Sequence, residues 1–420
     1  MAKALYISSF GEGHVNPTLG LANDLVKRGE HIVYYSSNDF EEKIKKTGAE
    51  FRPVDQSAQR KLQKSSNLVN SQPREYLLQF LSALEIMTDT ILDEISKETY
   101  DYILYDAQSL TGKWIAHQRK LLSIVTWTTF AFLQDLKSNM GLTGTSDMKR
   151  KQESLAMLQA FLRLEEIEKC KKHLEKKYEV PLPENFLFCS GSGDLNIVFT
   201  SSYFQRNSHD FKGNYIFVGP SILDSKALGD FPIDMLKEKR VIFISMGTIL
   251  NKQFDLYQKC FAALKDLDVK VVLNIGRKLT VEQLGNVPDN FIIRNYVPQL
   301  DVLRHTDVFI SHCGMNSTSE SLYFEVPLVM LPMMNDQPIV AQRVKELGAG
   351  IILDVQQLTV ENLKQAVSDV FKNPIYKENA KKISRSFRDA GGYAKAADEV
   401  FKFTRLNNCF NSCPEKGTTF

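Results

Sequence analysis

Short apolar segments rich in Val, Ile, Leu and Tyr recur along this chain, and amphipathic stretches with helical spacing separate them. This alternation is typical of βα units, in which helices cover both faces of a parallel sheet. The segments fall into two series. The first comprises Ala4–Ser8, His31–Tyr35, Tyr102–Tyr105, Ser123–Thr126 and Leu195–Phe199, and the second comprises Val241–Ser245, Lys270–Leu273, Phe291–Arg294, Val308–Ser311 and Leu328–Leu331. The sequence therefore predicts an α/β protein with two Rossmann-like, doubly wound domains.

The length of the chain agrees with this division. Its 420 residues exceed one core of ordinary size and suit two domains with a cleft between them. The stretch Gly219–Met235 contains Gly and Pro and lacks a clear period, as expected of a linker. We therefore expect an N-terminal domain over residues 1–218, a linker over 219–235 and a C-terminal domain over 236–392.

Composition narrows the possible partners and cofactors. Lys and Arg number 52 against 50 Asp and Glu, a net charge of +2, so we expect no nucleic-acid partner and no stable membrane insertion. The first apolar run is too short for a signal peptide, and the six cysteines lack the CxxC spacing of a zinc site. We expect a cytoplasmic protein that holds no metal and is a monomer or weak dimer.

Between Asp147 and Tyr178 the chain is densely charged, and its apolar residues recur at helical intervals. The simplest interpretation is a pair of solvated helices packed on the first domain. A lid over a substrate and a helix at a membrane surface are the alternatives.

A histidine follows the first predicted strand. Asn16 suits the N-cap of the next helix and Pro17 its first position, so we expect His14 in the loop before that helix, at the carboxyl edge of the sheet. Asn16 also replaces the third glycine of a GxGxxG motif, which argues against a dinucleotide cofactor. A neutral imidazole can withdraw a hydroxyl proton, and Asp106, after strand Tyr102–Tyr105, would reach the same edge and fix its tautomer. A purely structural histidine is the alternative.

A second group of polar residues follows the strand Val308–Ser311. Glycine and small polar residues begin a helix there, so free N–H groups and the positive end of the helix dipole form an anion site without net protein charge. Gly314 allows close backbone approach, and Glu320, one turn later, suits ribose hydroxyls better than phosphate. The candidate donors to a diphosphate are His312, Asn316 and Ser317. A neighbouring loop offers Ser245, Gly247 and Thr248 to the same cleft, and Asp336 and Gln337 have the character of sugar-binding residues.

From Tyr296 to Gln337 the sequence resembles the donor-binding signature of the UDP-glycosyltransferase superfamily, whose inverting family 1 members have the GT-B fold. The segment GHVNPTLG around His14, the position of Asp106 and the chain length extend the resemblance to the whole protein. It is most similar to bacterial macrolide glycosyltransferase-like members. Tyr296 and Met315 stand where plant members have tryptophan.

The resemblance implies a role for each candidate residue. His14 would be the general base and Asp106 its partner, while Val297 and Gln299 would border the uracil. Gln337 would favour glucose in the UDP-sugar co-substrate, and no cofactor would be required. The helix Tyr393–Leu406, within residues 393–408, would pack back on the N-terminal domain before a tail over 409–420.

The function expected from these features is inverting transfer of a hexose from UDP-glucose to a hydroxyl of a small apolar or aromatic acceptor, such as a macrolide or flavonoid. Phe130 and Phe132 are candidate acceptor contacts, although core packing explains them equally well. A nucleotide-sugar epimerase on the same fold and a lipid glycosyltransferase at a membrane surface are the alternatives.

Overall fold

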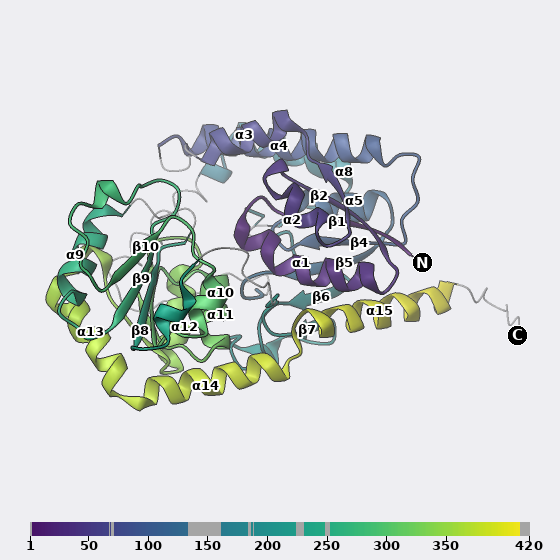
Figure 1. Cartoon of the computed structure of the whole chain (residues 1–420). Coiled ribbons are helices and arrows are strands. Elements are labelled where there is room, and N and C mark those ends of the chain that lie inside the picture. Colours follow the sequence, from purple (N-terminus) through teal and green to yellow (C-terminus); the bar gives the residue numbers. More distant parts are fainter. Residues whose placement is uncertain are drawn as a thin grey trace, which may run out of the picture. The chain divides into compact units, whose positions relative to one another are not determined.

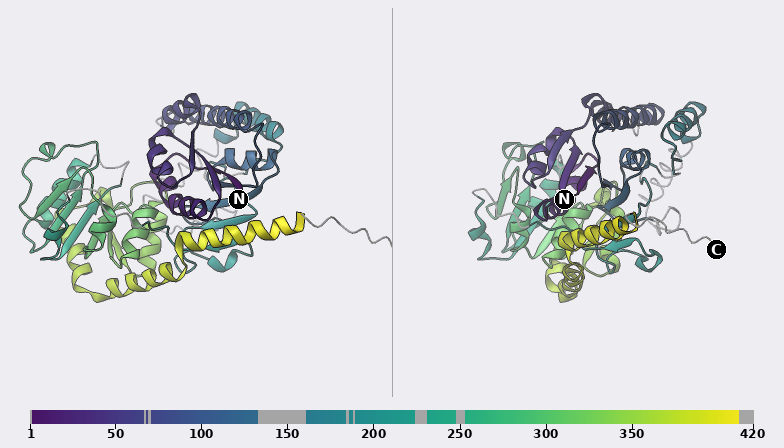
Figure 2. Two further views of the ribbon diagram at one scale, coloured as in Figure 1. Left: turned by 45° about the vertical axis from the view of Figure 1, so that its right-hand side comes forward. Right: turned by 90° about the vertical axis from the view of Figure 1, so that its right-hand side faces the viewer.

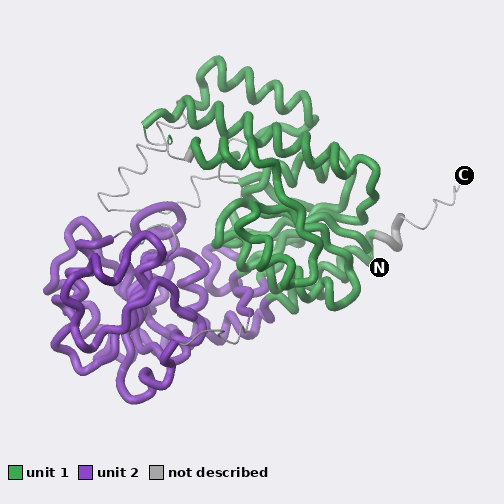
Figure 3. The backbone as a smooth tube through the Cα atoms, turned by 45° about the horizontal axis from the view of Figure 1, so that its top comes forward, with its two compact units in different colours: residues 1–199, 209–217, 393–420 green, residues 200–208, 218–392 purple. Residues whose placement is uncertain are grey.

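A computed structural model describes residues 2–66, 68, 71–132, 161–183, 186–187, 189–223, 231–247 and 253–411. The chain divides into two compact units (Figures 1 and 3). Unit 1 comprises Met1–Phe199, His209–Phe217 and Tyr393–Phe420, and unit 2 comprises Thr200–Ser208 and Val218–Gly392.

The segment Thr200–Ser208 belongs to unit 2, although we expected it in the N-terminal domain. Its contacts explain the difference. The Arg343 guanidinium donates to the carbonyl oxygens of Tyr203 and Phe204, at 2.7 and 2.9 Å. The Phe204 ring also packs edge-on against Phe387, with ring centroids 5.4 Å apart. These contacts hold the segment to unit 2.

Unit 1 is built on a seven-stranded parallel sheet in the order β3-β2-β1-β4-β5-β6-β7. Its strands are β1 (Lys3–Ile7), β2 (His31–Ser36), β3 (Glu50–Pro53), β4 (Tyr102–Asp106), β5 (Leu122–Trp127), β6 (Leu195–Val198) and β7 (Tyr215–Phe217). Its helices are α1 (Glu12–Lys27), α2 (Glu41–Lys45), α3 (Gln56–Ser66), α4 (Pro73–Glu94), α5 (Leu110–Gln118), α8 (Glu165–Tyr178) and most of α15 (Gly392–Asn411). Helices α4, α5 and α8 lie on one side of the sheet and α1 on the other (Figures 1 and 2). Strands β1 and β4 are consequently buried on both faces.

Unit 2 contains a six-stranded parallel sheet in the order β10-β9-β8-β11-β12-β13. Its strands are β8 (Val241–Ser245), β9 (Lys270–Asn274), β10 (Phe291–Arg294), β11 (Val308–Ser311), β12 (Leu328–Met330) and β13 (Gly350–Ile352). Its helices are α9 (Phe254–Leu264), α10 (Gln299–Leu303), α11 (Met315–Tyr323), α12 (Gln337–Glu346), α13 (Val360–Lys372) and α14 (Pro374–Asp389). Both sheets are therefore doubly wound, as the two series of apolar segments predicted.

Helix α1 begins earlier than expected. Its first residue is Glu12, so His14 lies in the first turn and Pro17 lies inside the helix. The Gly11 carbonyl oxygen accepts from the backbone N–H groups of His14 and Val15, both at 3.0 Å, which closes the turn before Pro17. The prediction of an N-cap at Asn16 was wrong because a proline beyond the first turn removes one helical hydrogen bond without ending the helix.

Only the second half of the charged segment 147–178 lies within the described residues, and it forms α8. The buried side of α8 packs on unit 1 through Tyr178, whose ring stacks on Trp114 at 4.6 Å. The Tyr178 hydroxyl donates to Asp89 at 2.9 Å, and Lys177 pairs with Glu85 and Asp89. Burial and ion pairing thus fix this helix against α4 and α5 (Figure 1).

The last helix, α15, leaves unit 2 and joins unit 1 at Tyr393. Its Ala396, Ala397 and Val400 side chains are buried. Asp398 accepts a 2.5 Å hydrogen bond from Arg28 at the end of α1, and the same guanidinium lies 5.8 Å from the centroid of Phe401. These contacts fasten the end of the chain to its first helix.

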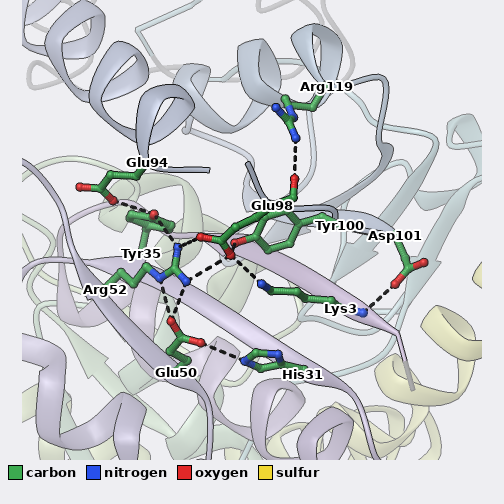
Figure 4. Close-up of polar contacts among 10 residues, drawn as sticks. All are labelled: Lys3, His31, Tyr35, Glu50, Arg52, Glu94, Glu98, Tyr100, Asp101 and Arg119. Carbon is green, nitrogen blue, oxygen red and sulfur yellow. Dashed lines mark hydrogen bonds and ion pairs between the residues drawn. The ribbon is translucent and has the colours of Figure 1, made fainter. Parts of the chain in front are cut away.

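Strands of unit 1 are also joined by a network of ion pairs (Figure 4). Arg52 of β3 donates to both carboxylate oxygens of Glu98, at 2.7 and 3.2 Å, and to Glu50 at 2.8 Å. Lys3 of β1 reaches Glu98 at 2.6 Å, and His31 of β2 contacts Glu50 at 2.9 Å. The network connects β1, β2 and β3 with the loop that precedes β4.

Candidate active site

The structure brings His14 and Asp106 together in unit 1. His14 Nδ1 lies 2.9 Å from Asp106 Oδ2. The carboxylate is 1% exposed and the imidazole 25% exposed, so the acid is shielded while the base is accessible. Because an ionised carboxylate only accepts hydrogen bonds, this contact places the proton of a neutral ring on Nδ1 and leaves Nε2 as the basic nitrogen. The arrangement suits general base catalysis on a hydroxyl.

Three further donors surround the Asp106 carboxylate. Oδ1 accepts from the Ser9 hydroxyl at 3.1 Å and from the Gln108 backbone N–H at 2.8 Å. The Thr128 hydroxyl lies 3.2 Å from His14 Nδ1 and 3.5 Å from Asp106 Oδ2. Sequence reasoning missed Ser9 and Thr128. Their position directly after β1 and β5, the strands on either side of β4, is the signal that could have identified them.

In unit 2 the loop after β11 holds His312 between two glycines. A Cβ atom at Gly247 would lie 2.7 Å from His312 Nε2, and one at Gly314 would lie 2.8 Å from it, so neither position tolerates a side chain. His312 Nδ1 is buried and has no hydrogen-bond partner among the described residues. Burial lowers the pKa of His312 to about 4, against a weaker opposing effect of the Ser245 backbone. The ring is therefore neutral near pH 7 and can donate a hydrogen bond only as a dipole, without a net charge.

Helix α11 begins immediately after this histidine. Gly314 is its N-cap, and Asn316 and Ser317 lie in its first turn, so their backbone N–H groups are at the positive end of the helix dipole. The preceding residue, Cys313, has a φ of 66°, and its backbone N–H donates to Ser311 Oγ at 3.1 Å. The loop geometry can therefore present donors to a phosphate, as inferred from the sequence.

Gln299, Ser317 and Glu320 form one hydrogen-bonded group. The Gln299 side-chain amide donates to Glu320 Oε2 at 2.5 Å and to Ser317 Oγ at 3.3 Å. Burial raises the pKa of Glu320 to about 7, although the bond from Gln299 opposes the rise. Glu320 thus has little preference for either charge state near neutral pH.

The remaining candidates for binding the UDP-sugar differ in their burial and in the hydrogen bonds that they already make. Val297 is 2% exposed and follows β10, and Ser245 is buried at the end of β8. Gln337 Oε1 accepts from the backbone N–H groups of Met333 and Met334, at 2.8 and 3.0 Å, so this oxygen already stabilises the loop before α12. Asp336 is the N-cap residue of α12, and Thr248 lies outside the described residues.

The two aromatic acceptor candidates in unit 1 contribute to its interior. Phe130 is 4% exposed, and the Phe132 ring packs edge-on against Trp127 with ring centroids 6.3 Å apart. Core packing therefore accounts for the contacts that the structure gives them.

No group of three or more His, Cys, Asp or Glu side chains within the described ranges is arranged to hold a metal ion. Among the helices that the structure describes, none is both long and apolar enough to cross a membrane.

Comparison with known proteins defines the class. The fold resembles the glycosyltransferase of kitacinnamycin, with a TM-score of 0.80, 25% identity and coverage of 96% of this chain and 98% of that one. A family model for UDP-glucoronosyl and UDP-glucosyl transferase matches residues 213–392. The uncharacterised UDP-glucosyltransferase YojK of Bacillus subtilis is 39% identical over 406 residues, which cover 96% of this chain and 97% of the relative. The oleandomycin glycosyltransferase of Streptomyces antibioticus is 27% identical over 399 residues, or 92% of this chain and 87% of that protein.

The protein is a glycosyltransferase with two parallel-sheet domains of the GT-B type. It belongs to the family 1 UDP-glycosyltransferases.

Proposed function

We propose that the protein transfers a hexose from UDP-glucose to a hydroxyl group of a small apolar or aromatic molecule, such as a macrolide or flavonoid, with inversion at the anomeric carbon. The hydrogen bond between His14 and Asp106 carries the proposal, because an oriented, neutral imidazole is what an alcohol acceptor requires. The macrolide class is supported by the name of the oleandomycin relative.

The proposed step is a single displacement. His14 Nε2 takes the proton from the acceptor hydroxyl, and the oxygen attacks the anomeric carbon of the sugar. A new carbon–oxygen bond forms as the bond between that carbon and the diphosphate oxygen breaks. The electron pair leaves with UDP, and the Asp106 carboxylate stabilises the imidazolium through Nδ1–H.

Donor binding would belong to unit 2. The α11 N-terminus with His312, Asn316 and Ser317 would hold the diphosphate. Glu320 would accept from the ribose hydroxyls, while Val297 and Gln299 would border the uracil. Asp336 and Gln337 would contact sugar hydroxyls, the latter through its amide nitrogen because its oxygen bonds the Met333 and Met334 backbone.

The test is transfer itself. Incubation of the protein with UDP-glucose and a panel of phenols and macrolides should give products heavier by one hexose. His14→Ala should reduce transfer to an alcohol by roughly 10²- to 10⁴-fold, the usual contribution of a general base, with UDP affinity nearly unchanged. Glu320→Ala is the matched control, because it should weaken donor binding instead.

A nucleotide-sugar epimerase on the same fold is the second candidate, and it would leave the His14–Asp106 pair without a role. Epimerised UDP-sugar in the absence of any glycosylated product would reject the transferase assignment. Full activity of His14→Ala toward an ordinary alcohol would reject the assigned base.

A further inference from the structure

Two hydroxyl groups lie on opposite sides of the Asp106 carboxylate. Ser9 donates to Oδ1 at 3.1 Å, and Thr128 lies 3.5 Å from Oδ2. The sheet order explains this arrangement, because β4 lies between β1 and β5. Asp106 ends β4, Thr128 is the first residue after β5, and Ser9 is the second after β1. Three adjacent strand ends thus meet at one carboxylate.

Each carboxylate oxygen has a separate set of partners. Oδ1 is held by Ser9 and by the Gln108 backbone N–H, on the side away from the histidine contact. Oδ2 faces His14 Nδ1 at 2.9 Å and the Thr128 hydroxyl. When Nδ1 carries the proton, Thr128 cannot donate to it and is therefore oriented to donate to Oδ2. A buried carboxylate needs such donors, and Asp106 is 1% and Thr128 7% exposed.

We infer that Ser9 and Thr128 are positioning residues for the base: they fix the Asp106 carboxylate from both sides so that Oδ2 holds His14 in one tautomer and orientation. This inference rests on the proposed roles of His14 and Asp106. Ser9 acts entirely through Asp106, whereas Thr128 contacts both members of the pair.

Loss of either hydroxyl would change the electrostatic interaction between Asp106 and His14. Loss of a donor leaves more negative charge on Asp106, which strengthens its attraction to the imidazolium and raises the pKa of His14. Among the residues that the structure describes, Tyr6, Tyr34 and Cys189 also sense the charge of Asp106. Burial raises the pKa of each, to about 12 for Tyr34 and about 11 for Cys189, so they stay neutral in the assay range.

The experiment compares Ser9→Ala and Thr128→Val on two acceptors, an alcohol and a nitrophenol that is already ionised at the assay pH. With the alcohol, kcat should fall roughly 10-fold for each variant, as for loss of one hydrogen bond to a charged group, while donor KM stays constant. The acid limb of the pH profile should move to higher pH. With the ionised nitrophenol the loss should disappear, because that acceptor needs no base. Thr128→Ser should restore kcat.

Thr88→Val is the matched control, because it removes a buried hydroxyl from the same unit that bonds Leu84 and Thr111 instead. It should leave both acceptors unaffected. Three results would overturn the inference: equal losses of kcat on both acceptors, a raised donor KM with normal kcat, or failure of Thr128→Ser to restore activity. If His14→Ala also reduces kcat equally on the alcohol and on the ionised nitrophenol, the proposed function fails instead.

Discussion

Burial sets the charge state of two residues beside the loop after β11. His312 has a pKa of about 4 and is neutral near pH 7, so in the proposed donor site it would offer the diphosphate a hydrogen bond and not an ion pair. Glu320 has a pKa of about 7 and changes charge in the range where the enzyme would work. Neither property follows from the residue types, because an unperturbed histidine titrates near pH 6.5 and a glutamate near pH 4.3.

The Glu320 carboxyl predicts a pH dependence of donor binding. Its ionised form accepts hydrogen bonds from ribose hydroxyls better than its neutral form, so the dissociation constant for UDP-glucose should fall as pH rises from about 6 to about 8. Calorimetric titration of the His14→Ala variant would measure this without turnover. Glu320→Gln should abolish the dependence, and a slope that persists in that variant would assign it to another group.

Ionisation of Glu320, which should strengthen donor binding, should at the same time lower the stability of the folded protein. Because the folded-state pKa of Glu320 is raised, ionisation destabilises the folded protein progressively from the unfolded pKa up to about 7 and fully above it. Glu320→Gln should therefore raise the unfolding temperature of the ligand-free protein more at pH 8 than at pH 5.

Residue types and strand ends were enough to single out His14 and Asp106, because side chains after parallel strands meet at one edge of a sheet. They could not single out Ser9 or Thr128. Hydroxyl residues follow many strands, and the order β1-β4-β5 that makes these two relevant is a property of the folded sheet. The contact of Gln337 with its own loop could not be predicted from the sequence either, because it depends on how the chain turns before α12.

At the level of elements, ten of the thirteen strands that the structure describes were predictable and three edge strands were not. Strands β3, β7 and β13 lie at sheet edges, contain three or four residues and are only partly buried, so β3 has no apolar run and those of β7 and β13 are very short. The start of α1 was missed for another reason. Pro17 resembles a first helical residue, and only the hydrogen bonds of Gly11 reveal the turn before it.

The ion-pair network of Figure 4 predicts an acid-dependent contribution to stability. Arg52 and Lys3 lower the pKa of Glu98 to about 2, so its ionised form stabilises the fold at any pH above the unfolded pKa. Glu98→Gln should lower the free energy of unfolding at pH 7 by about 1 kcal/mol, because solvent screens part of the interaction. Urea titrations would measure it.

The difference in free energy of unfolding between the unmodified protein and Glu98→Gln should shrink as pH falls below about 4.5 and vanish near the folded pKa of about 2. Lys237→Gln is a suitable control, since Lys237 forms an exposed pair with Asp234 and should have little effect. A penalty for Glu98→Gln that is independent of pH would show that packing, and not charge, connects these strands.

At the scale of the whole molecule, the near-balanced charge predicts that donor binding depends only weakly on salt concentration. None of the proposed donor residues is Lys or Arg, and the chain carries a net +2. Dipolar donors are screened by salt far less than exposed ion pairs, so donor KM should change less than about 2-fold between about 50 and 500 mM NaCl. Steady-state kinetics with an uncharged acceptor would measure it. A rise of 10-fold or more would indicate that a basic side chain binds the diphosphate.

The course of the chain limits how such enzymes can be recombined. Because α15 returns to unit 1, a hybrid made by one crossover near Val218 would combine α15 and the rest of unit 1 from two different parents. The Arg28–Asp398 and Arg28–Phe401 contacts would then depend on chance compatibility. A second crossover at Gly392, which returns α15 to the parent of unit 1, would preserve them. The same path means that unit 1 can be completed only after α15 has been synthesised and has left the ribosome.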